Sequence, residues 1–284
     1  MLKILFATDG GEPAVAALSL LEKVAQRDAV EITALSVVSG SVHSEEDVRR
    51  ADETVYQAVE RLLGAGFKAD GRTTRGHPAA EIVEEANRGY DLISMGAGNK
   101  RWYDRLLLGS QSTRVLHSAP CSVLIVHEAP PEEGRTKILV GADGSADSKF
   151  SLDILCGMAD LEACEATVLA VAQVSFPTFA GGPGVAYPTT AFTKDIERTL
   201  TASAQGYAED AANRLRGAGL DTVAKWMLGS AAIRLLEEAE GMPADLVVVG
   251  SRGLGAVDRW LMGSVSDKMA RYTRAALVAR HRQG

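Results

Sequence analysis

The chain has 284 residues, of which 46% are hydrophobic and 24% charged, and its net charge at pH 7 is −7. This length predicts two compact domains. The acidic balance argues against a general nucleic-acid or anionic-membrane surface, which would need a basic stripe. The apolar run at the N-terminus is interrupted at Asp9, too early for a signal-peptide core or a membrane span. Three cysteines without a CxxC spacing fit a reducing compartment. We therefore expect a cytoplasmic protein with no membrane segment and no nucleic-acid partner.

Short apolar runs alternate with amphipathic stretches along the first half of the chain. The runs that predict strands are residues 4–8, 32–38, 67–75, 91–96 and 122–126, and the stretches that predict helices are residues 14–26, 46–66, 79–88 and 110–118. Apolar strands joined by helical crossovers form a parallel sheet with helices on both faces. In such α/β sheets, ligands bind at the carboxyl ends of the strands.

The second half of the chain repeats the first. Asp9 in TDGG is matched by Asp143 in ADGS, a shift of 134 residues, whereas Gly109 is matched by Gly263, a shift of 154 residues. The second copy therefore carries an insertion in its middle. The residues at 175–193 are rich in Gly, Pro and Thr, and we expect them to form a loop that covers a bound ligand.

The duplication predicts the domain boundaries. We expect a first domain at residues 1–128 and a second domain at residues 136–284. The Pro-rich residues 129–135 between them are short, so the two halves should pack closely.

Glycines and serines follow a buried strand near the end of the second half: Gly250, Gly253, Gly263, Ser264 and Ser266. Glycine lets backbone amides approach an anion closely. The helix expected from Ser264 offers unpaired amides at its N-terminus, where an anion is favoured. The serine hydroxyls add donors, or one of them caps the helix. This pattern predicts a polyphosphate ligand.

Two common phosphate motifs fail here. Gly250 and Gly255 have the Walker A spacing, but Ala256 and Val257 stand where that motif requires Lys and Ser or Thr. The dinucleotide fingerprint fails because Asp258 occupies the place of its third glycine. The scattered histidines have no metal-ligand spacing.

The pattern Gly250-x2-Gly253-x9-Gly263-Ser264 resembles the nucleotide-binding signature of the universal stress protein family. The resemblance covers nearly the whole chain twice. It implies two tandem flavodoxin-like α/β domains, each with a five-stranded parallel sheet of order 3-2-1-4-5 and helices on both faces. It also implies ATP as the cofactor, with Mg²⁺, pairing of domains through their last strands, a homodimer, and a role as a stress sensor or regulator with an unidentified protein partner.

The resemblance places adenosine near Asp143, adenine beside Val171, and the phosphates on the glycine and serine residues. The expected contacts in the second half are Asp143, Val171, Gly250, Arg252, Gly253, Gly263, Ser264, Val265 and Ser266. We add Arg252 because of its charge; alternatively, it is a solvated loop residue. The corresponding residues of the first half are Asp9, Val37, Gly96, Asn99, Gly109, Ser110 and Ser112. Because Asn99 replaces the second glycine, we expect the nucleotide mainly in the second half.

Other interpretations of these residues stay open. Asp9 and Asp143 are also typical of turns and of helix N-caps. A slow ATPase or a nucleotidyl-transfer enzyme is an alternative, although no general base, nucleophile or catalytic lysine is evident. An interaction scaffold that binds no nucleotide is a second alternative.

Overall fold

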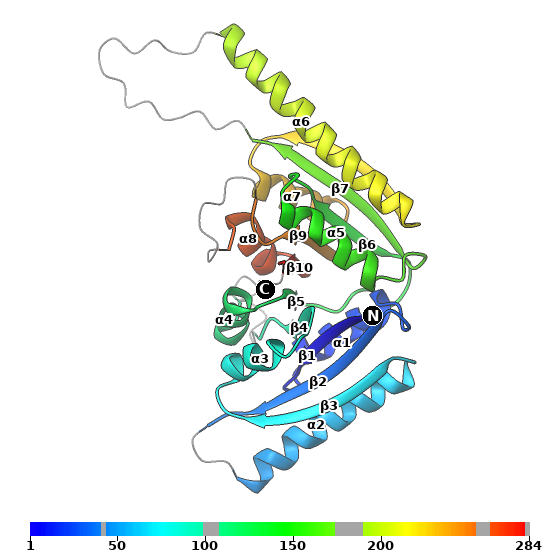
Figure 1. Cartoon of the computed structure of the whole chain (residues 1–284), viewed down its shortest axis with the longest axis vertical. Coiled ribbons are helices and arrows are strands. Elements are labelled where there is room, and N and C mark those ends of the chain that lie inside the picture. Colours follow the sequence, from blue (N-terminus) through cyan, green and yellow to red (C-terminus); the bar gives the residue numbers. More distant parts are fainter. Residues whose placement is uncertain (41–43, 99–107, 174–189, 254–261, 282–284) are drawn as a thin grey trace, which may run out of the picture.

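The computed structural model of the chain describes residues 1–40, 44–98, 108–173, 190–253 and 262–281. Its strands form one ten-stranded sheet in the order β3-β2-β1-β4-β5-β10-β9-β6-β7-β8 (Figure 1). The strands are β1 (Leu2–Ala7), β2 (Val30–Val38), β3 (Lys68–Arg75), β4 (Leu92–Gly96), β5 (Ser122–Val126), β6 (Thr136–Gly141), β7 (Cys164–Ala172), β8 (Asp221–Leu228), β9 (Leu246–Gly250) and β10 (Ala275–Ala279). The helices are α1 (Glu12–Val24), α2 (Glu45–Gly64), α3 (Pro78–Ala86), α4 (Ser110–Ser118), α5 (Ala146–Met158), α6 (Thr190–Gly217), α7 (Ala231–Gly241) and α8 (Ser264–Tyr272).

The strand order predicted for each half is confirmed. The first half runs β3-β2-β1-β4-β5 and the second runs β8-β7-β6-β9-β10, with parallel pairs throughout each half. The strand predicted at 122–126 and the helix predicted at 110–118 match β5 and α4 at both ends. The loop predicted at 175–193 extends too far, because α6 begins at Thr190. No Gly or Pro interrupts the chain between Thr190 and Gln205, so the helix continues. The rest of that insertion lies outside the described residues.

The two halves join through their last strands, as the resemblance implies. β5 pairs with β10 antiparallel, from Val126 opposite Ala275 to Val123 opposite Val278. All other pairs are parallel, so the strands of one half run opposite to those of the other half. The carboxyl ends of the strands, which we call the carboxyl edge of each half, therefore lie on opposite sides of the joined sheet.

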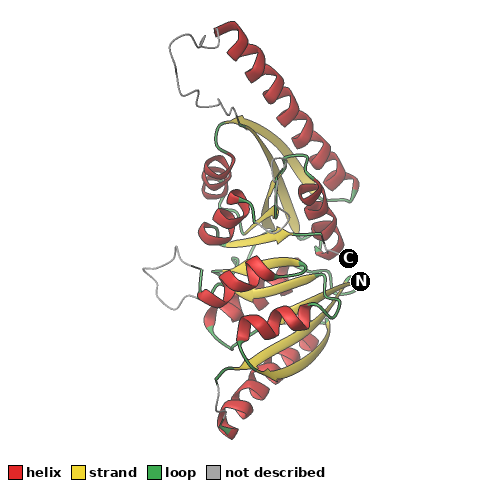
Figure 2. Cartoon of the chain, turned by 60° about the vertical axis from the view of Figure 1, so that its left-hand side comes forward, coloured by secondary structure: helices red, strands yellow, loops and turns green. Residues whose placement is uncertain are grey.

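Helices cover both faces of the sheet (Figure 2). One buried cluster joins α1, α2, α5 and α6 to one face, and a second joins α3, α4, α7 and α8 to the other. Neighbouring strand residues alternate between them, so Ile4 belongs to the first cluster and Leu5 to the second. Each cluster contains residues of both halves, and the two halves therefore share one core on each face.

The three cysteines are free thiols: Cys121 and Cys164 are buried, and Cys156 is partly buried. Among the described helices, none has the length and apolar character needed to cross a bilayer.

Candidate functional site

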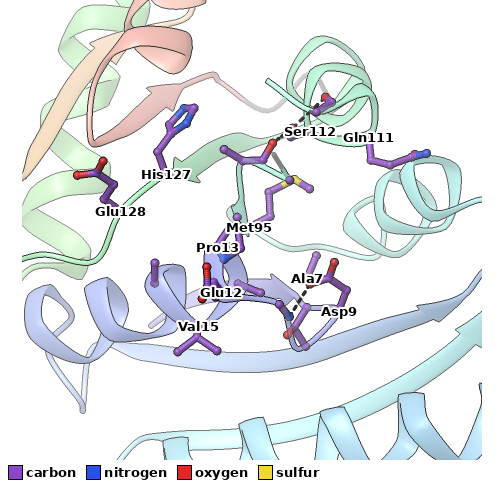
Figure 3. Close-up of a pocket in the computed structure, with 18 of the residues that line it drawn as sticks. Ala7, Asp9, Glu12, Pro13, Val15, Met95, Gln111, Ser112, His127 and Glu128 are labelled. Atoms are coloured by element: carbon purple, nitrogen blue, oxygen red, sulfur yellow. Dashed lines mark hydrogen bonds between the residues drawn. The ribbon is translucent and has the colours of Figure 1, made fainter. Parts of the chain in front are cut away.

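A cavity of about 1630 Å³ opens at the carboxyl edge of the first half (Figure 3). In Figure 3, α1 lies along one side of it, Gln111 and Ser112 of α4 lie on another, and His127 and Glu128 lie at a third. The residues predicted for the first half that line this cavity are Asp9, Val37, Gly96, Gly109, Ser110 and Ser112. The remaining one, Asn99, lies outside the described residues. The topology thus brings the described part of the predicted site together around one space.

Asp9 and Asp143 organise tight turns after the first strand of each half. Asp9 Oδ1 accepts a hydrogen bond from the Gly11 amide at 2.9 Å, and Asp143 Oδ1 accepts one from the Ser145 amide at 3.0 Å. The glycine between donor and acceptor has a φ near +75° in both turns, a conformation that glycine adopts readily. The turn interpretation of both aspartates is therefore confirmed. The N-cap interpretation is wrong, because Gly11 and Ser145 are the N-caps of the helices that follow.

The N-termini of α4 and α8 have the same construction. Gly109 is the N-cap of α4, and its amide donates to Ala97 O at 2.8 Å. Gly263 is the N-cap of α8, and its amide donates to Ser251 O at 2.8 Å. Neither helix has a side-chain N-cap hydrogen bond among the described residues. The alternative in which a serine caps α8 is therefore wrong, since Gly263 takes that position.

The serines of these two helices face in different directions. Ser112 and Ser266 are buried, and each hydroxyl lies within hydrogen-bond distance of two backbone carbonyls of the preceding loop, at 2.8–3.0 Å. These two residues fix the loop to the helix. Ser110 and Ser264, the first residues of the helices, are exposed. Their hydroxyls and the nearby first-turn amides are available to an anion.

The loop after β9 is held to α5 by a buried carboxylate. Asp147 is 5% exposed, and its Oδ2 accepts hydrogen bonds from Ser251 Oγ at 2.6 Å and from Arg252 Nε at 3.0 Å. Ser145 Oγ, at the start of the same helix, donates to Arg252 O at 3.2 Å. Arg252 is thus an ion-paired residue with a mostly covered side chain, and the alternative of a solvated loop residue is wrong.

Two glycines of the second half lie against neighbouring chain segments. A methyl group on Gly250 would lie 2.6 Å from Ser148 N, so this glycine lets β9 pack against α5. A methyl group on Gly253 would lie 2.7 Å from Asp143 Oδ2, which places the glycine loop directly over the turn after β6. The structure therefore brings Asp143, Arg252, Gly253 and Gly263 together.

The remaining predicted residues of the second half are Val171, near the end of β7, and Val265, in α8. Both are partly buried and pack against the second apolar cluster, as does Val37 of the first half. Gly255, Ala256, Val257 and Asp258 lie outside the described residues.

Two contacts that no sequence pattern indicated cross the seam, by which we mean the antiparallel β5–β10 pair that joins the two halves. His127 follows β5, and its Nε2 lies 2.8 Å from Ala270 O near the C-terminus of α8. Arg280 follows β10, and its Nη1 donates to Ala119 O at 2.8 Å, after the C-terminus of α4. Each half thus places a nitrogen donor at the end of a helix of the other half, where the helix dipole favours it. The contacts are long-range, and no local pattern identifies them.

The described residues contain no group of three or more His, Cys, Asp or Glu side chains placed to hold a metal ion. Burial lowers the pKa of His127 below its ordinary value, which favours the neutral imidazole. Burial raises the pKa of the Cys164 thiol to about 11, so this thiol has no thiolate character at neutral pH.

The fold defines a class of protein: a doubly wound α/β protein made of two repeated flavodoxin-like units with ligand-sized space at a carboxyl edge. The family model described as "Universal stress protein family" matches residues 1–127 and 134–279. The chain therefore belongs to the universal stress protein family, in tandem form.

Relatives and a solved structure agree with this placement. Universal stress protein Rv2623 of Mycobacterium tuberculosis is 30% identical over 207 residues, which cover 71% of this chain and 65% of that protein, just under two thirds of its length. A universal stress protein of Mycolicibacterium smegmatis is 30% identical over 243 residues, covering 84% of this chain and 78% of the relative. The crystal structure of a universal stress protein from Archaeoglobus fulgidus has a TM-score of 0.68 at 22% identity and covers 98% of both chains. This last likeness concerns the fold alone.

Proposed function

We propose that the chain binds an adenine nucleotide, primarily ATP, and acts as a nucleotide-dependent regulator of a stress response. The observation that carries the proposal is the cavity at the carboxyl edge of the first half. Asp9, Val37 and Ser110 line it from three different elements, in the places where the family resemblance puts adenosine, adenine and phosphate. The exposed N-terminus of α4 faces the phosphate end, where its dipole favours an anion.

We propose a second site in the second half, and the sequence favours this half as the principal one. The glycine signature is complete there, and Arg252 adds a guanidinium beside it. Asp147 holds that guanidinium in a fixed position. A phosphate at the N-terminus of α8 would be a second anionic partner of the Arg252 guanidinium, in addition to Asp147. It would lie on the exposed side of the loop after β9.

Mg²⁺ would enter such a site bound to the nucleotide phosphates, since Mg²⁺ usually keeps few protein ligands. A homodimer, a protein partner and a cytoplasmic location remain predictions. Analytical ultracentrifugation tests the first of these directly.

The test places a carboxylate where each phosphate is expected. In Ser110→Glu and Ser264→Glu, the new side chain repels phosphate, but an acidic residue in the first turn stabilises a helix, so each variant should fold. Isothermal titration of the wild-type protein with ATP should give two sites. Each single variant should lose one site, and the double variant should lose both. At each altered site, the affinity for ATP should fall at least about tenfold, which corresponds to 1.4 kcal/mol.

Each single variant serves as the control for the other, because its unmodified half is intact. If only Ser264→Glu lowers binding, the nucleotide site is confined to the second half. Full ATP binding by the double variant would contradict the proposal.

A further inference from the structure

The cavity of the first half continues far beyond the place proposed for the phosphates. Along the edge of the joined sheet, its lining passes from the end of β2 over β1 and β4 to His127 and Glu128 after β5. It then reaches Arg274, immediately before β10, and Ala244, before β9. Because β5 and β10 are antiparallel, the amino ends of the second half's strands lie beside the carboxyl ends of the first half's strands. The second half therefore supplies one end of the first half's cavity.

The length of this edge exceeds what one mononucleotide occupies. Adenine beside β2 and phosphate at β4 lie two strand spacings apart, or about 10 Å for spacings of about 4.8 Å. From β4 to β9 there are three further spacings, or about 14 Å. The volume of about 1630 Å³ is also above the roughly 300–1000 Å³ common for sites of single small ligands. Space for a second group of nucleoside size lies on the far side of the phosphates.

The far part of the cavity has the chemistry of a nucleoside site. Tyr272, an aromatic residue at the end of α8, is 46% exposed and lines the cavity together with Leu236 and Ala239 of α7. Such a surface binds a flat ring by stacking and apolar contact. Glu128 and Glu240 line the same part, and carboxylates accept hydrogen bonds from ribose hydroxyls.

The charges of the far part argue against further phosphate. Arg274, the guanidinium of this region, is bound to Asp245 at 3.1 Å and lies 3.9 Å from Glu128. With Glu240 nearby, the carboxylates outnumber the guanidinium, so a polyanion is disfavoured there. A neutral group of nucleoside type fits.

We infer that the ligand of the first half is a dinucleoside polyphosphate: two nucleosides joined through a phosphate chain, one beside β1 and β2, the other against Tyr272 and α7. The inference rests on the proposed nucleotide site, because it uses that site for the first nucleoside and the phosphates. The structural feature behind it is the seam that places α7 and α8 at the end of the cavity. No covalent change is involved.

The test compares diadenosine tetraphosphate with ATP by isothermal titration. Ser264→Glu is the background, so that the first half is measured by itself. Diadenosine tetraphosphate should bind at least tenfold more tightly than ATP. Tyr272→Ala removes the aromatic surface, and Ala239→Trp fills the far part of the cavity. Both variants should abolish the preference for diadenosine tetraphosphate over ATP and leave the affinity for ATP unchanged.

Ile233→Trp is the matched control for Ala239→Trp. Ile233 lies on the same helix, is 53% exposed and is not part of the cavity lining, so this variant should keep the full preference. Equal affinities for both ligands with ATP binding intact would overturn the dinucleoside inference alone. Absence of binding for both ligands would overturn the nucleotide site of the first half as well.

Discussion

The loop after β9 in the second half and the loop after β4 in the first half occupy equivalent places but are held differently. Asp147 binds Ser251 and Arg252 and ties the second loop to α5. The equivalent positions of the first half are Pro13, Ala97 and Gly98, which have no side-chain group for such an ion pair. That half carries the wide cavity that reaches across the seam.

What the two halves share is scaffolding. Both keep the glycine at the end of the strand, the glycine N-cap of the next helix and the buried serine that fixes the loop to it. The difference lies in the residues between these fixed points. Duplication has therefore preserved this frame and changed the side chains between its fixed points.

The largest effect is expected where the halves agree. A methyl group on Gly96 would lie 2.5 Å from the Pro13 backbone, much as one on Gly250 would meet Ser148. Gly96→Ala and Gly250→Ala should each lower the free energy of unfolding by about 2–3 kcal/mol, a typical cost of overpacking. Urea denaturation measures this. Gly64→Ala, which has open space around it, should cost nothing. Tolerance of either the Gly96 or the Gly250 variant would show that the end of that strand can move.

The next largest effect is a loss of stability from breaking an ion pair that only the second half has. Asp147→Asn removes the counter-charge of Arg252 and should cost about 1.5–2 kcal/mol, as for a hydrogen bond to a charged group. Glu46→Gln, which breaks the exposed pair with Arg50, is the control and should change stability by less than about 0.5 kcal/mol. A double-mutant cycle with Arg252→Gln isolates the pair. A coupling energy near zero would mean that the contact does not hold the loop.

A smaller effect is expected on binding. Gly253→Ala brings a methyl group against the Asp143 carboxylate, which must shift, and should lower the ATP affinity of the second half severalfold. The titration uses Ser110→Glu as the background. The converse change, Asn99→Gly, completes the motif of the first half and should raise its affinity severalfold on the Ser264→Glu background. Unchanged affinity in both cases would remove the second glycine from the site.

The smallest effect is on the pH dependence of stability. It distinguishes the His127 contact across the seam from the Arg280 contact. Burial lowers the pKa of His127 below 6.5, although Ala270 O and Glu128 favour the charged form. The unfolded chain therefore binds more protons, and stability should fall as the pH drops below about 6.5. Arg280, the equivalent residue, stays charged throughout this range. His127→Gln should flatten this part of the profile of unfolding free energy against pH. An unchanged profile would assign the loss to other groups.

Much of the fold could be predicted from the sequence, because it is encoded locally. Apolar runs such as residues 122–126 mark buried strands, and helical crossovers dictate parallel pairing. The internal repeat then supplies the same order for the second half. The end of the insertion was misplaced because the composition of residues 175–193 hides the start of α6.

The site was less predictable, since its contacts are long-range. Spacing identified Gly109 and Gly263, but did not show that Ser112 and Ser266 face inward while Ser110 and Ser264 face solvent. Asp147 was missed because an acidic residue in the first turn of a helix is typical of dipole stabilisation alone. The one sequence feature that sets Asp147 apart is that the matching position of the first half is Pro13.

The antiparallel seam between β5 and β10 has a consequence for any molecule that recognises this protein. It turns the two carboxyl edges to opposite ends of the sheet, separated by strands of five residues or about 17–20 Å. Ligands in the two halves would face away from each other, and a partner that touches one ligand would not reach the other from the same side. If both halves bind a ligand, the duplicated chain would present two recognition surfaces on opposite sides of the sheet, one for each ligand.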